Sequence, residues 1–239
     1  MPSPSARNVW FASGTALTKL STTSITLAGI CGLPQDLYPG LSRCPDATNL
    51  PTGTTVANAA SYLLGDTTTE VRLGGRFRDR TTVIGDIINS TPVISAPGDD
   101  YGYRSLGGVY ATSYLDYLTS KRNSRRYTVY VGANDGMLHA YDGGMDAQGN
   151  LGGNGGRELF GYIPGTSYGH LGNLLMPYDP ANKNNQKFAH RYFVDGPVAV
   201  GDTYNNNTWS TTLVGTTGAG GRSVFALDVS DPTAFDDGK

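Results

Sequence analysis

The sequence predicts an all-β protein built from repeated antiparallel units. Glycine supplies 33 of the 239 residues, which is roughly twice its ordinary share of ~7%. Tyrosine, with 15 residues, outnumbers phenylalanine and tryptophan together. Turn-rich chains with many short alternating segments are typically all-β. The third observation is a hairpin pattern that occurs twice.

The first copy of the hairpin lies in RYTVYVGANDGMLHAYDGG, residues 126–144. Val129 and Val131 alternate with Thr128 and Tyr130, which is the period of a strand. Asn-Asp-Gly at 134–136 supplies the positive φ angles that a tight turn needs. The second copy is TTLVGTTGAGGRSVFALDVS, residues 211–230, with a longer glycine-rich turn.

Matching segments precede both hairpins. GDIINSTPVI (85–94) and YFVDGPVAVGD (192–202) each carry an aspartate and then a Pro-Val pair. The pair begins a strand, where proline is tolerated. GRELFGYIP (156–164) follows the first hairpin as a further strand. We therefore expect four antiparallel strands in the first unit, at about 92–95, 127–133, 137–142 and 157–163.

Tandem four-stranded units with glycine-bearing hairpins predict a β-propeller, in which neighbouring blades cover both faces of each sheet. The chain holds about two blades, and the second begins near Val194 and runs out at Lys239 before its fourth strand. A closed propeller needs about 4–8 blades. We therefore expect a partial propeller that belongs to a longer protein or to a truncated gene product.

A lead-in and short helical insertions accompany the blades. VANAASYLL (56–64) predicts a short helix, with Thr55 as N-cap and Gly65 as stop. Residues 1–80 are expected to be an irregular lead-in with a disulfide loop and this helix, and residues 81–239 to be the partial propeller. Within the propeller we expect a first blade, an inter-blade loop and a truncated second blade, at about 85–164, 165–191 and 192–239.

An insertion at 96–126 carries the candidate interaction surface. Within GGVYATSYLDYLTSKRNS, Tyr110, Tyr114 and Tyr117 share one helical face with Leu118. Tyrosines provide rigid, amphipathic area and are common at interfaces. Function on propellers is often carried by such insertions, because the blades are scaffold. Packing of this face onto the propeller is the favoured alternative.

Charge, hydropathy and cysteine usage exclude several classes of protein. The net charge of −2 provides no basic field for nucleic acid, and no apolar run is long enough for a transmembrane segment. The start, MPSPSARNVWFASG, lacks the apolar core of a signal peptide, so an export signal would lie outside this chain. Cys31 and Cys44 enclose a Pro/Gly-rich loop. We expect a disulfide between them in an exported protein and two inert thiols in a cytosolic one.

The sequence shows no catalytic constellation. His139 aligns with Phe225 of the second hairpin, so we interpret its position as a packing site. His170 and His190 have no serine or cysteine nucleophile pattern around them. No paired carboxylates at strand ends suggest hydrolysis. We therefore expect a protein that is not an enzyme and acts by binding.

Four ordered motifs resemble the PilC/PilY family of type IV pilus assembly and tip-associated proteins, whose C-terminal region is a modified propeller of the quinoprotein-like class. The motifs are ASYLLGD with FRDRTTVIGDIINSTPVI (60–66 and 77–94), VYVGANDGMLHAYD (129–142), HRYFVDGPVAVGD (190–202) and LVGTTGAGGRSVFALDVSDP (213–232). The resemblance covers about residues 56–232, and residues 1–55 contribute little to it.

The resemblance implies an exported, non-enzymatic protein that promotes pilus extension against retraction and mediates surface adhesion. The implied location is the cell surface, at the pilus tip or in the outer membrane and periplasm. The implied partners are pilin and minor pilins, together with host or abiotic surfaces.

The resemblance also implies calcium binding. The family's calcium loops place Asp or Asn at alternate positions, in a pattern like D-x-D-x-D/N, and no such run occurs in this sequence. The nearest approach is YDGGMDAQGN, in which Asp142, Asp146 and Asn150 are spaced four apart and would offer oxygen ligands. The alternative interpretation of these residues is a solvated loop between strands.

Two other functions are compatible with the hairpin motif alone. A fragment of a PQQ-dependent dehydrogenase would need a tryptophan beneath the cofactor, and neither Trp10 nor Trp209 lies in a convincing site. A scaffold propeller of envelope assembly is the third hypothesis. Dye reduction after loading with PQQ and calcium would favour the dehydrogenase fragment. An outer-membrane protein defect with normal pili would favour the scaffold propeller.

Overall fold

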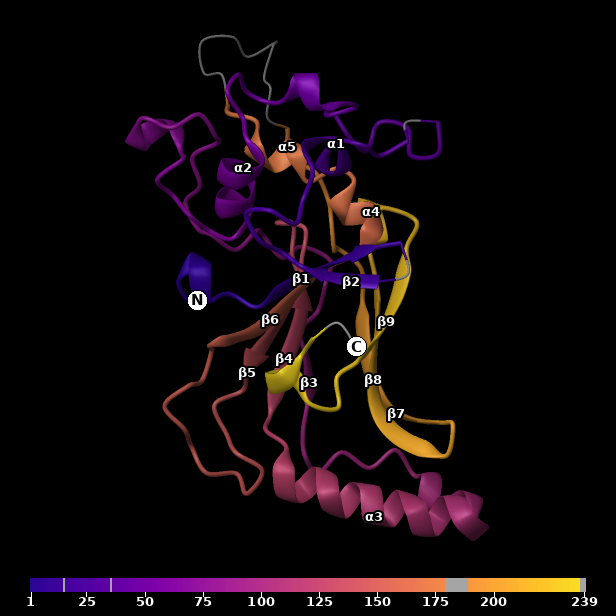
Figure 1. The fold of residues 1–239 in the computed structure, drawn as a ribbon. Helices are drawn as coiled ribbons and strands as arrows, with labels where there is room; N and C mark the ends of the chain where they lie inside the picture. The colour runs from indigo at the N-terminus through magenta and orange to yellow at the C-terminus, as the bar shows by residue number, and fades with distance from the viewer. Residues whose placement is uncertain (15, 35, 179–188, 237–239) are drawn as a thin grey trace.

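The chain folds into two β-sheets that lie between helices at the two ends of the molecule (Figure 1). The structure is a computed structural model that describes residues 1–14, 16–34, 36–178 and 189–236. Helices α1, α2, α4 and α5 gather at one end, and α3 lies across the other. The α-helices are α1 Leu27–Ile30, α2 Val56–Leu63, α3 Gly108–Ser124, α4 Gly165–Tyr168 and α5 Gly172–Leu175. Short 3₁₀ helices are η1 Pro4–Ala6, η2 Ala47–Asn49, η3 Val71–Leu73, η4 Tyr103–Leu106, η6 Gly218–Gly220 and η7 Pro232–Ala234.

The first sheet contains the four strands expected of the first unit. These are β3 Val93–Ser95, β4 Thr128–Gly132, β5 Leu138–Asp142 and β6 Glu158–Ile163, and they pair antiparallel in chain order. The Asn-Asp-Gly turn joins β4 to β5, and Gly136 takes a φ of 96°. Such a positive φ costs glycine nothing, whereas other residues rarely adopt it.

Two more strands extend this sheet, so the expectation of an irregular lead-in is wrong for residues 9–13 and 16–19. β1 (Val9–Ser13) lies parallel to β6, with Val9 beside Gly161, and β2 (Ala16–Lys19) pairs antiparallel with β1. Val9 and Phe11 are buried by this pairing. The sheet therefore has the order β2-β1-β6-β5-β4-β3.

The second sheet is formed by β7 (Val198–Asn205), β8 (Thr208–Thr216) and β9 (Val224–Asp228). Asn206 and Asn207 join β7 to β8 with φ angles of 47° and 60°. Two successive positive φ angles match the twist of the hairpin, and asparagine tolerates them. Within the described residues this sheet has three strands, in the order β7-β8-β9, and the truncated second blade stays a prediction.

Three hydrophobic clusters hold the sheets and the helices together, and the third packs α3 on the second sheet. One cluster joins the sheets, where Tyr130, Leu138 and Phe160 lie in the same buried group as Leu213 and Phe225. Another packs the α1, α2 and α5 end against β1 and the turn after β4. Within the described residues, no helix has the length and hydropathy needed to cross a membrane.

α2 begins where the sequence predicts and ends at Leu63, one residue before the predicted end. The Thr55 hydroxyl accepts a hydrogen bond from the Asn58 backbone, and the Asn58 side chain accepts one from the Thr55 backbone. This capping box pairs two backbone donors that the first turn would leave open. Gly65 follows the helix with a φ of 102°. Nearby, a disulfide joins Cys31 to Cys44, whose Cα atoms are 4.9 Å apart.

α3 packs its tyrosine face against the β7–β8 hairpin. Tyr114 is fully buried, and its ring centroid lies 4.6 Å from that of Trp209. Lys121 is also buried and forms an ion pair of 2.7 Å with Asp202 on β7. The insertion is therefore fixed to the second sheet by aromatic packing and one buried charge pair.

Candidate functional site at the Asn-Asp-Gly turn

The turn between β4 and β5 is hydrogen-bonded to two segments that are distant in sequence, at residues 85–86 and at Phe193. The Asn134 side-chain oxygen accepts a hydrogen bond of 3.0 Å from the Phe193 backbone. The Asn134 backbone N–H donates to the Asp86 carbonyl at 3.0 Å. The Asp135 carboxylate accepts from the Gly85 backbone at 3.1 Å. The turn thus positions both the segment after the α2 end and the segment before β7.

A buried ion network lies behind this turn. Arg7 donates two hydrogen bonds of 2.7 Å to Glu158, from Nε and from a terminal nitrogen. Glu158 also binds His139 Nδ1 at 2.8 Å, and His139 Nε2 lies 3.1 Å from both Asp135 oxygens. The side chains of Arg7, His139 and Glu158 are at most 2% exposed. Two cations and two carboxylates therefore balance one another inside the fold.

The network keeps its members charged despite their burial. Burial opposes protonation of His139, but Asp135 and Glu158 together raise its pKa to about 9. Burial also opposes ionisation of Glu158, yet hydrogen bonds from Arg7 and His139 lower its pKa to about 2. His170 shows the contrary case, because burial without a carboxylate lowers its pKa to about 3. His170 is neutral and stacks on Phe193 at 4.1 Å between ring centroids.

The interpretation of His139 as a packing site that corresponds to Phe225 is wrong. In the β4–β5 pair, Val131 lies opposite His139, and in the β8–β9 pair, Val214 lies opposite Ala226. The counterpart of His139 is therefore Ala226. The longer second turn shifts the register by one residue relative to the sequence alignment. His139 is buried, as expected, but it belongs to a charged network.

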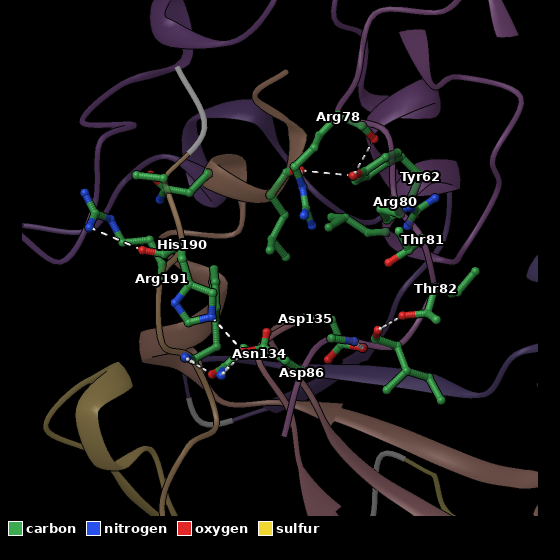
Figure 2. A pocket seen from close by; sticks show the side chains of 18 residues that line it. Tyr62, Arg78, Arg80, Thr81, Thr82, Asp86, Asn134, Asp135, His190 and Arg191 are labelled. Carbon is green, nitrogen blue, oxygen red and sulfur yellow. Dashed lines mark hydrogen bonds and ion pairs between the residues drawn. The ribbon is translucent and has the colours of Figure 1, made fainter. Parts of the chain in front are cut away.

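A cavity of about 270 Å³ opens beside the turn. Figure 2 shows Tyr62, Arg78 and Arg80 on one side, with Asn134 and Asp135 opposite them. The Tyr62 hydroxyl donates to the Arg78 and Leu174 carbonyls at 3.1 Å, which fixes the first side. The cavity therefore lies between the α2 end of the molecule and the turn that joins β4 to β5 in the six-stranded sheet.

Most charged groups that line this cavity already have partners. Arg80 forms an ion pair of 2.9 Å with Glu70 and stacks over the Tyr62 ring at 3.7 Å. Asp86 accepts a hydrogen bond of 2.8 Å from His190. Asp135 is paired with His139, which holds the pKa of Asp135 below its usual range in spite of burial. The site offers fixed charges for binding, and its geometry shows no nucleophile activated by an adjacent base.

Comparison with known proteins gives a match to a range of residues that includes this turn. Residues 84–236 match the family model described as the PilY1 beta-propeller domain. This match covers more than half of the chain. The chain belongs to the PilY1 β-propeller family. The prediction of a β-propeller relative of PilC/PilY is thereby confirmed, whereas the number of blades and the quinoprotein-like type stay predictions.

Named relatives of this PilY1-family chain are proteins of bacterial pili. A type IV pilus biogenesis factor PilY1 homolog of Xylella fastidiosa is 39% identical over 165 residues, covering 67% of the chain and 10% of the relative. The type IV pilus biogenesis factor PilY1 of Pseudomonas aeruginosa strain UCBPP-PA14 is 33% identical over 230 residues, covering 96% of the chain and 17% of the relative. The chain thus spans between a tenth and about a sixth of these relatives. The crystal structure of the P. aeruginosa PilY1 C-terminal domain is 33% identical, with a TM-score of 0.32, and the match covers 50% of the chain and 18% of that structure.

The calcium candidates Asp142, Asp146 and Asn150 have protein partners in this structure, and calcium binding by them stays a prediction. Asp142 is buried and pairs with Arg126 at 3.1 Å. Asp146 accepts hydrogen bonds from the Gln148 and Asn150 backbones and from the Asn150 side chain. These bonds hold the loop of residues 146–150 together. Across the residues described, no group of three His, Cys, Asp or Glu side chains is placed to hold a metal. The three candidates serve as loop and strand-end hydrogen-bond partners.

The tyrosine candidates divide between packing and exposure. Tyr114 is fully buried, and Tyr117 is half-buried, with its hydroxyl 2.9 Å from Thr211. Tyr110 is 44% exposed and meets Tyr204 edge to face. The stripe therefore serves mainly as the seam between α3 and the second sheet, which was the favoured alternative.

The network residues Arg7, Asp135 and Glu158 were missed by the sequence reasoning. Arg7 stands in the lead-in, and Glu158 begins a strand that looked like any other. The one usable signal was a histidine flanked by apolar residues on a strong strand, because a buried histidine needs hydrogen-bond partners. That signal indicates that His139 has a polar partner, but it does not identify the partner residue.

Proposed function

We propose that this chain is a non-enzymatic segment of a type IV pilus biogenesis factor and that it acts by binding. The observation that carries the proposal is the match of residues 84–236 to the PilY1 propeller family. The names of the relatives from Xylella and Pseudomonas support a role in making pili. Among the described residues that line the cavity, no nucleophile lies beside an activating base, and this supports a binding role.

The finer parts of the proposal concern place and partners. The protein promotes pilus extension against retraction, acts at the cell surface, at the pilus tip or in the outer membrane and periplasm, and contacts pilin, minor pilins and host or abiotic surfaces. The motifs shared with the pilus-associated family support these assignments. Calcium binding at Asp142, Asp146 and Asn150 is part of the proposal that rests on the family motifs alone, and it would compete with the Arg126 pair of Asp142 and the Asn150 hydrogen bonds of Asp146.

The test is a count of sheared surface pili, with twitching motility, in a strain that lacks the full-length gene. Loss of pili that return when retraction is also disabled would support the role in extension. Restoration by the full-length gene is the control. Normal pili and normal attachment in the deletion strain would reject the proposal.

A pair of glycine variants connects this test to the present segment. Gly132→Val in the full-length gene forces a Cβ against the Val194 carbonyl oxygen beside the turn. Gly153→Val places the same side chain where no atom lies within 4 Å. We expect the first variant to fail to restore pili and the second to restore them. Equal restoration by both would show that the segment is dispensable for pilus assembly.

A further inference from the structure

The connection between β5 and β6 contains the one Asn-Gly dipeptide of the chain, at Asn154 and Gly155. Figure 1 shows this connection as a long loop that extends beyond the ends of the two strands. Both residues are exposed to solvent. Because glycine has no Cβ, the nitrogen of Gly155 can approach the side-chain carbonyl carbon of Asn154 with less steric hindrance than the nitrogen of any other residue type.

The hydrogen bonds of this loop leave the two groups free to meet. The Arg157 backbone N–H donates to the Asn154 carbonyl at 3.0 Å, and the Gly156 N–H donates to the Asp142 carbonyl at 2.8 Å. These bonds close the turn without engaging the atoms that would react. The described residues give neither the Asn154 side chain nor the Gly155 N–H a hydrogen-bond partner. Their approach therefore breaks no hydrogen bond within the protein.

The same loop contains a second asparagine in the opposite situation. The Asn150 side chain donates to the Asp146 carboxylate at 3.1 Å, and the Asn150 backbone N–H donates to it at 2.9 Å. The next residue is Leu151, whose side chain crowds its own backbone nitrogen. Asn150 is thus held in place and hindered, whereas Asn154 is neither.

The surroundings of Asn154 favour a negative charge. Asn154 lines a cavity together with Lys19, Arg126 and Arg157. The two carboxylate side chains in this wall are at most 2% exposed, and each has an arginine partner. The wall therefore presents an excess of positive charge, which attracts a negative charge that forms on it.

We propose that Asn154 of the folded protein is converted spontaneously to aspartate and isoaspartate, with water as the co-reactant. The Gly155 nitrogen attacks Asn154 Cγ, and the new C–N bond closes a succinimide ring. The side-chain nitrogen leaves as ammonia and carries away the proton that the Gly155 nitrogen loses. Water then adds to either ring carbonyl and opens the ring. Each conversion consumes one water, releases one ammonia and needs no oxidant or reductant.

The conversion changes both charge and backbone. The new carboxylate lowers the formal net charge of the chain by one, from −2 to −3. Isoaspartate also adds one methylene to the backbone between Asn154 and Gly155. The added length falls beside the hydrogen bond from Gly156 to Asp142, the last residue of β5. We therefore expect the isoaspartate form to loosen this end of β5.

The experiment incubates the 239-residue chain at pH 8, with its disulfide intact, in buffer and in urea. Mass spectrometry of the peptides that contain residues 150 and 154 reports the exchange of NH₂ for OH, and isoaspartate methylation reports the isomer. We expect Asn154 to convert in buffer at a rate comparable with that in urea, while Asn150 stays unchanged in buffer. Conversion of Asn154 in urea alone, or in neither solution, would overturn the proposal.

Matched variants locate the reaction. Asn154→Gln lengthens the side chain, so attack by the next nitrogen no longer closes a five-membered ring, and the isoaspartate signal of this loop should be lost. Asn150→Gln is the control in the same loop and should leave that signal unchanged. A signal that persists in Asn154→Gln, or that falls equally in both variants, would overturn the assignment to Asn154.

Discussion

Replacing His139 by glutamine should reveal the charge that the histidine carries inside the fold. His139 is fully buried, and it is the link between Glu158 at 2.8 Å and Asp135 at 3.1 Å. Glutamine has a similar reach and keeps an amide donor, but it is neutral at every pH. The substitution therefore removes the charge while it leaves the Arg7–Glu158 pair in place.

The magnitude follows from the pKa of His139. The folded-state pKa of about 9 lies above the unfolded value of ~6.5. The charge therefore contributes its full stabilisation below about pH 6.5, and that contribution is lost as the pH rises through 9. A shift of this size corresponds to about 3 kcal/mol of unfolding free energy. We expect His139→Gln to cost about 3 kcal/mol more at pH 6 than at pH 10.

The assay is urea unfolding of both proteins at pH 6, 8 and 10, followed by circular dichroism with the disulfide intact. Tyrosine and lysine titration at high pH acts on both proteins equally, so the difference between them isolates His139. His170→Gln is the control: the pKa of His170 is lowered to about 3, so this residue is neutral throughout the range tested. A stability gap between wild type and His139→Gln that stays the same from pH 6 to pH 10 would refute a charged His139.

Three further substitutions test other parts of the fold. The double change of Cys31 and Cys44 to serine opens a loop with a sequence separation of 13 and should lower the unfolding free energy by about 3 kcal/mol, measured in urea. Lys121→Met leaves the buried Asp202 without a cation and should cost about 3–5 kcal/mol, measured by thermal unfolding. Thr55→Ala removes the cap of α2 and should cost about 1 kcal/mol, with faster hydrogen exchange in that helix.

Each of these changes has a matched control. Reduction of the wild-type disulfide should reproduce the serine variant, and an unchanged urea midpoint on reduction would contradict the prediction. Lys19→Met alters an exposed lysine and should have little effect; a loss as large as that of Lys121→Met would count against the buried pair. Thr52→Ala changes an exposed threonine before the helix, and exchange in α2 that responds equally to both threonine variants would exclude a specific cap.

Features set by neighbouring residues were predictable from the sequence. The Asn-Asp-Gly turn, the α2 cap at Thr55 and the stop at Gly65 depend on backbone angles and on hydrogen bonds within a few residues. The alternation in residues 127–133 and 137–142 likewise shows on its own which segments form strands. These signals sufficed for β3–β6 and for the β7–β9 hairpin segments.

Features set by distant partners were not predictable in the same way. Nothing in the β1 sequence VWFAS indicates that it pairs parallel with β6, because parallel strands are not joined by a short turn that the sequence would show. His139 gives no sign of Glu158, and Tyr114 gives none of Trp209, since each pair meets only after folding. The register of the second hairpin was also ambiguous, because a longer turn permits more than one alignment of its strands.

The parallel pairing of β1 with β6 has a consequence for the order in which the protein is made. Arg7 and Glu158 are separated by 151 positions, and a ribosome adds about 5–20 residues per second. The strands β1 and β2 therefore wait about 8–30 s for their partner β6. In that interval β1 and β2 form a lone hairpin, which is at best marginally stable in water, and Phe11 is not yet buried. The β1–β2 pair is thus fixed in place only well after it has been made.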